Sequence, residues 1–117
     1  MGNELTVNSA EVRAHAAATD AFAGRADTAT AAGAHLTTLN DAYGLLCQPF
    51  GAMVVSPQAR GTEALGGAAK SLHEMSSKLT EAAQAYEDTE QRITDLMKQL
   101  VEQLDAAAAC IPTVRGN

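Results

Sequence analysis

The sequence contains no tryptophan, only two phenylalanines and two tyrosines, and three prolines in 117 residues. Because 46% of its residues are hydrophobic, the chain can still form a core, but it must build that core from aliphatic and small side chains. No run of alternating β-branched and aromatic residues indicates a strand, whereas alanine, leucine, glutamate, glutamine and lysine dominate the second half and favour helix. The sequence therefore predicts an all-α protein.

Basic residues are scarce as well. Eight lysines and arginines stand against 14 acidic residues, giving a net charge of -6, and no basic cluster could neutralise a phosphate backbone. No segment approaches the roughly 20 apolar residues of a membrane span, and the first residues do not resemble a signal peptide. We expect no nucleic-acid partner and no transmembrane segment, and any export would proceed without a cleavable signal peptide.

An apolar seam runs along the second half of the chain. Large hydrophobic side chains recur every seven residues, with others at intermediate positions, which is typical of one face of a long helix. Because a helix cannot bury a seam of about five heptads by itself, the seam requires a partner helix from this chain or from another. The residues predicted to form this partner interface are Leu65, Leu72, Leu79, Ile93, Leu96, Leu100 and Leu104.

The first half predicts a second helix with a thinner seam. Asn8 can cap it, because Asn oxygens accept hydrogen bonds from the backbone at a helix start, and Glu11 stands where its side chain can reach back to the cap. We expect this helix over about residues 9–42. Its larger apolar residues are also spaced by seven: Phe22, Ala29, Leu36 and Tyr43.

Glycines and prolines interrupt the helical pattern in the middle of the chain and predict a bend over about residues 43–56. Ser56 followed by Pro57 is typical of a helix start, because serine caps and proline loses no needed donor at the first helical position. We therefore expect the second helix over about residues 57–109. It could begin near Phe50 if Pro57 only kinks it.

Helix lengths limit what the hairpin can cover. If the two helices fold back antiparallel, the roughly 34 residues of the first reach only to about Glu90 of the second. The apolar segment beyond, from Ile93 to Leu104, must then pack against another subunit or fold back. We expect residues 1–111 to form one helical hairpin domain, with a flexible tail at 112–117. The hairpin would assemble as a dimeric four-helix bundle, with a second copy or with a related helical protein.

The sequence offers little for catalysis. His15, His35 and His73 have no carboxylate or cysteine at metal-ligand spacing, and neither a phosphate-binding loop nor a nucleophile motif is present. We predict no enzyme, no cofactor and no metal. Cys47 and Cys110 lie too far apart to pair within a straight hairpin, which favours free thiols over an intermolecular link or a bridge made by a folded-back helix.

Two short motifs resemble those of a known family. Residues 43–50, YGLLCQPF, are similar to the glycine-cysteine-phenylalanine turn of the ESX-1 secretion-associated protein family, EspC type, of actinobacteria. Residues 86–90, YEDTE, resemble the Tyr-x-x-x-Asp/Glu signal of type VII secretion substrates. The likeness covers most of residues 4–97. The chain lacks the Trp-x-Gly turn of the wider WXG100 superfamily, and its second helix continues farther than the family pattern.

The resemblance implies a small non-enzymatic protein that the type VII (ESX) machinery recognises in a folded, dimeric form and delivers to the cell envelope or medium. Carried over to this sequence, Tyr86 and Glu90 would be the signal residues and Gly44 the turn glycine. From the residues alone, Tyr86 could instead only fill its place in the seam. The chain would then be a cytoplasmic helical adaptor or chaperone acting through coiled-coil-like packing.

Overall fold

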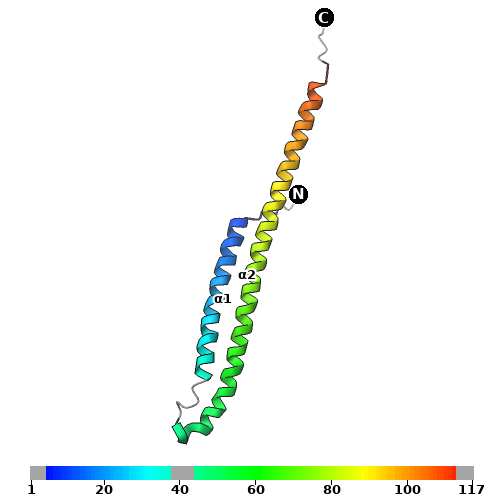
Figure 1. Ribbon diagram of the computed structural model, residues 1–117. Coiled ribbons are helices and arrows are strands. Elements are labelled where there is room, and N and C mark those ends of the chain that lie inside the picture. The colour runs from blue at the N-terminus through cyan, green and yellow to red at the C-terminus, as the bar shows by residue number, and fades with distance from the viewer. Residues whose placement is uncertain (1–4, 38–43, 113–117) are drawn as a thin grey trace.

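The computed structural model describes residues 5–37 and 44–112, which form two long helices packed antiparallel as a hairpin (Figure 1). Helix α1 spans Ser9–Thr37 and helix α2 spans Gly44–Ala109. The molecule measures 115 × 27 × 15 Å and has a radius of gyration of 29.7 Å, more than twice the roughly 13 Å of a compact domain of this length. The predicted all-α hairpin is confirmed, and its shape is a rod.

The start of α1 follows from its cap. The side-chain oxygen of Asn8 accepts hydrogen bonds from the backbone N–H of Ala10 at 3.1 Å and of Glu11 at 3.4 Å, and the helix begins at Ser9 as predicted. At the other end α1 reaches Thr37. The predicted continuation over residues 38–42 lies outside the described residues, as does Tyr43.

Helix α2 begins much earlier than predicted. It starts at Gly44 and carries both Pro49 and Pro57 inside it, so most of the expected bend at 43–56 is helical. Proline removes one backbone hydrogen bond and presses on the preceding turn, which bends a helix without having to end it. Figure 1 shows the first turns of α2 turned away from the axis of the rest. Gly44 has φ +64°, a left-handed conformation that favours glycine.

Small side chains form the contact between the helices. The apolar residues with the least exposure are all alanines, and Thr19 and Gly51 are buried with them. No large side chain in the described part of the chain is fully buried. Such residues let two helices approach toward the short end of the usual 8–10 Å separation. The buried alanines are Ala16, Ala23, Ala69 and Ala83.

The predicted seams therefore flank this contact and do not form its centre. On α1, Phe22 and Leu36 remain more than half exposed, so this seam does not pack against α2. On α2, Leu72 and Leu79 are half-buried at the edge of the contact, and Leu65 is exposed. The heptad spacing was correct, but the helices meet on the adjacent stripe of small residues, where the backbones can come closer.

Beyond the end of the hairpin α2 continues alone, and we call residues 91–109 the overhang (Figure 1). Every residue of the overhang is exposed. Nowhere in the described ranges does a helix combine the length and the apolar character needed to cross a membrane. Cys47 and Cys110 are free, exposed thiols near opposite ends of α2, so the two do not form a disulfide within the chain.

Candidate functional site

The two predicted signal residues lie where α1 begins. Tyr86 and Glu90 stand one turn apart on α2, and both are exposed, Tyr86 by 44%. They line a shallow hollow of about 280 Å³ that the start of α1 helps to close. The other residues around this hollow are Val7, Ser9, Glu87, Gln91 and Thr94.

A charged pair fixes the start of α1 beside this hollow. Arg13 donates through Nε to Glu87 Oε1 at 3.1 Å and through Nη2 to Glu87 Oε2 at 2.7 Å, and Nη2 also donates to Gln84 Oε1 at 2.8 Å. The hydrogen bond from Arg13, followed by one from Ser9, lowers the pKa of Glu87. The two side chains are 38% and 40% exposed, so solvent screens the pair and it contributes little to stability. Its two-pronged geometry nevertheless fixes the register of α1 next to Tyr86.

A second polar cluster lies farther along the same hairpin. His73 of α2 lies between two carboxylates of α1, with Nδ1 2.9 Å from Asp20 Oδ1 and Nε2 2.9 Å from Asp27 Oδ2. The hydrogen bond with Asp27, and then that with Asp20, raises the pKa of His73. Both ring nitrogens can donate only in the protonated imidazolium. The arrangement is a pH-sensitive clasp between the helices.

Sequence reasoning treated His73 as isolated, and this was wrong because its partners lie on the other helix. The available signal was that Asp20 and Asp27 are seven residues apart and so share one face of α1. Without the register between the helices, nothing in the sequence brings that face to His73. The carboxylates do not make a metal centre, since no group of three or more potential ligands in the described ranges could hold an ion.

The histidine clasp also shows which sides of the two helices coincide. Asp20 and Asp27 meet His73 on one edge of the hairpin. Successive residues of a helix are rotated by about 100°. On each helix, the large apolar residues therefore lie on the side of the buried small residues that is opposite to Asp20, Asp27 or His73. In an antiparallel pair these sides face the same way. We call this opposite edge the apolar face: Phe22, Leu36, Leu65, Leu72, Met75, Leu79 and Tyr86.

The apolar face continues along the overhang. Its large side chains there are between 48% and 68% exposed, and they include four predicted interface residues. Met97 and Val101, which lie in the apolar segment expected beyond the hairpin, belong to the same surface. The exposed apolar residues of the overhang are Ile93, Leu96, Met97, Leu100, Val101 and Leu104.

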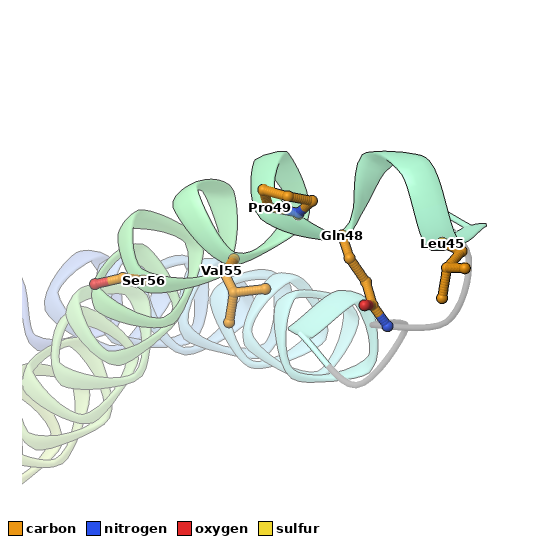
Figure 2. A pocket seen from close by; sticks show the side chains of 7 residues that line it. Leu45, Gln48, Pro49, Val55 and Ser56 are labelled. Carbon is orange, nitrogen blue, oxygen red and sulfur yellow. The ribbon is translucent and has the colours of Figure 1, made fainter.

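A larger hollow lies at the opposite end, on the inside of the bent first turns of α2. Figure 2 shows Leu45, Gln48 and Val55 extending from the same side of this segment. Leu45 and Gln48 are exposed, and no charged residue lines the hollow. Its shape and lining give it no catalytic chemistry. The predicted turn glycine, Gly44, immediately precedes it.

Comparison with known families gives one match. A family model described as the excreted virulence factor EspC of the diderm type VII ESX system matches residues 1–96. The matched range contains the hairpin, the Tyr86 hollow and the start of the overhang, and the remainder of the overhang lies beyond it. No curated protein and no solved structure shows a significant match.

Proposed function

The chain belongs to the EspC family of excreted type VII ESX virulence factors, and from this premise we propose that Tyr86 and Glu90 form its secretion signal. The protein is a non-enzymatic factor excreted through the ESX type VII system. Family membership thereby favours export over the alternative of a cytoplasmic adaptor or chaperone. The proposal concerns which residues the secretion machinery recognises.

The position of Tyr86 is the observation that supports the proposal. Its ring packs at the end of the hairpin while 44% of the residue remains accessible, and its hydroxyl makes no hydrogen bond to another described residue. A tyrosine suits recognition by a partner, because its ring is apolar and its hydroxyl can form a hydrogen bond. Glu90 adds a carboxylate one turn away, on the same side of the helix.

The folded hairpin contributes to this site. Arg13 holds the start of α1 against Glu87, which lies three residues before Glu90. Val7 and Ser9 border the hollow. An unfolded chain would present Tyr86 and Glu90 without this border. The arrangement therefore supports recognition of a folded substrate.

We further propose that the protein assembles through its apolar face, with a second copy or with a related helical protein, as a four-helix bundle. The support is the lack of an internal core: the buried apolar residues are alanines, while large side chains cover the outside of one edge. An exposed apolar surface of this extent marks an interaction site in soluble proteins. The hairpin contains only two helices, and burying this surface requires more.

The signal assignment is tested by excretion of point variants. The variants Tyr86→Ala and Glu90→Ala are expressed in the native host. Their amounts in cells and in culture filtrate are compared with those of the unchanged protein. We expect each variant to accumulate in cells, with excretion reduced on the order of tenfold for Tyr86→Ala, the magnitude of about 1.4 kcal/mol in recognition.

The matched control is Glu102→Ala, which removes another exposed carboxylate from the same helix, outside the family match. This variant should be excreted normally. Far-UV circular dichroism of each purified variant verifies that α1 and α2 still form. Excretion of folded Tyr86→Ala at the level of the control would show that the residue only occupies a seam position.

A further inference from the structure

The apolar stripe of the overhang is wider than a two-stranded coiled coil requires. Ile93, Met97, Leu100 and Leu104 follow a heptad seam, and Leu96 and Val101 extend it on either side. At about 100° per residue these six side chains span roughly 140° of the helix surface. A coiled-coil pair covers a narrow seam, whereas a broad stripe is typical of a helix packed against two neighbours.

The hairpin itself offers two neighbouring helices with a matching surface. Its apolar face combines Phe22 and Leu36 of α1 with Leu65 and Met75 of α2, and these side chains are 41% to 58% exposed. These side chains lie along one edge of the hairpin, on both of its helices. Helix α1 has 29 residues, or about 43 Å, so this face is longer than the roughly 28 Å of the overhang.

We propose that the overhang of a second copy of the chain covers this apolar face, and that the exchange is reciprocal. The two copies lie antiparallel about a twofold axis near Ala85. This inference rests on the proposed self-association and adds its geometry. Each overhang then packs between α1 and α2 of the other copy, forming three-helix segments on both sides of a short four-helix centre.

The position of the axis follows from the extent of the apolar surface on α2. That surface runs from Leu65 to Leu104, and its midpoint lies near Ala85. Reversing it about this point brings Leu104 of one copy level with Leu65 of the other. Apart from Tyr86, the large apolar side chains in this range of α2 then meet apolar surface, which an isologous interface requires.

Other arrangements leave apolar surface uncovered. A parallel dimer would give each overhang only one neighbouring helix, so its flanking residues Leu96 and Val101 would stay in water. An antiparallel dimer centred on the hairpin bodies would leave both overhangs without a partner. The overhang cannot turn back onto its own hairpin, because α2 is a continuous helix to Ala109.

The available area is sufficient for a stable dimer. Without Tyr86, ten large apolar side chains of the apolar face and overhang are about half exposed, which amounts to roughly 1,000 Å² per copy, compared with about 800 Å² per partner in a standard interface. Most of this surface belongs to leucine, isoleucine, methionine and phenylalanine. Their burial gives the core that the isolated hairpin lacks.

Spin-label distances between the two copies distinguish these geometries. In a Cys47→Ser, Cys110→Ser background, a single label is placed by Lys98→Cys, an exposed position on the polar side of the overhang. The antiparallel exchange separates the two labels by about 26 residues along the helix, or about 39 Å. A parallel dimer would bring them within about 20 Å, since helices in one bundle lie about 10 Å apart.

Ala85→Cys in the same background is the matched control, because it lies at the expected axis and should give a short distance. Light scattering on the same samples should give twice the chain mass of 12.1 kDa. A short distance at Lys98→Cys overturns the antiparallel exchange but leaves self-association intact. A mass of one chain at micromolar concentration overturns both. Neither result concerns the secretion signal, which the excretion of Tyr86→Ala tests separately.

Discussion

Ala83→Leu tests whether α1 and α2 meet through their small residues. Ala83 is completely buried between the helices. Leucine adds three carbon atoms at a point where the two backbones approach closely, and α1 is too long to move aside at one site without losing contact elsewhere. Overpacking of this kind costs about 1–3 kcal/mol.

Burial of the larger side chain works against this cost. Three added carbons would contribute roughly 2.4 kcal/mol if the site could expand to enclose them. Expansion here means separating the helices, which would expose Ala69 and stretch the hydrogen bond of 2.9 Å from Ser76 Oγ to the carbonyl oxygen of Ala16. Because the site cannot expand without these losses, the burial gain is not realised, and we expect destabilisation of about 1–3 kcal/mol.

The measurement is thermal unfolding followed by far-UV circular dichroism. For a chain of this size, 1 kcal/mol lowers Tm by about 4–8 °C. The protein concentration must be the same for all variants, because assembly makes Tm concentration-dependent. The control is Ala59→Leu, on an exposed part of the same helix away from the proposed dimer axis, which should change stability by less than about 0.5 kcal/mol. Equal Tm values for the two variants would refute the small-residue contact.

Two further predictions concern other parts of the hairpin. The clasp raises the pKa of His73, so the stabilisation it gives is complete below about pH 6.5 and is lost as the pH rises through the raised pKa. The Tm should therefore fall as the pH rises above about 6.5, and His73→Gln should remove that fall. An unchanged dependence of Tm on pH in this variant would exclude the clasp as its source. At the glycines, Gly24→Ala should stabilise by about 0.5–1 kcal/mol because its new Cβ meets open space. Gly33→Ala should destabilise because its Cβ would press on the Thr62 side chain, and equal effects at both glycines in urea unfolding would contradict the close approach there.

The local structure of this chain was predictable where one residue decides it. Asn8 specifies the start of α1, and the run of helix formers carries α2 to Ala109. The start of α2 was not predictable in the same way. Pro49 and Pro57 are strong local signals for a break, but a proline costs a helix only one hydrogen bond and a bend, and the turns on either side still form.

The register between the helices was beyond the sequence pattern. Heptad spacing identified Leu72 and Leu79 correctly as one stripe, yet the same spacing also describes the small residues Ala69, Ser76 and Ala83 beside it. Which stripe faces α1 depends on how closely the two backbones can approach. Hydrophobicity scores large apolar residues above small ones, so a sequence pattern points to the stripe of large residues. Tyr86 could be named from its motif, whereas the borders of its hollow, Val7 and Ser9, required the fold.

The separation of small residues from large ones has a physical reason. The contact between two helices is narrow, with solvent along both of its edges, so it can enclose small side chains but not large ones. Large residues placed there would force the helices apart, while large residues on one edge can be enclosed when further helices arrive. The alanine stripe thus determines the hairpin and the apolar face determines its assembly. If the proposed assembly buries the apolar face, that face supplies most of the buried apolar area, and folding stability should depend on protein concentration, as in obligate dimers.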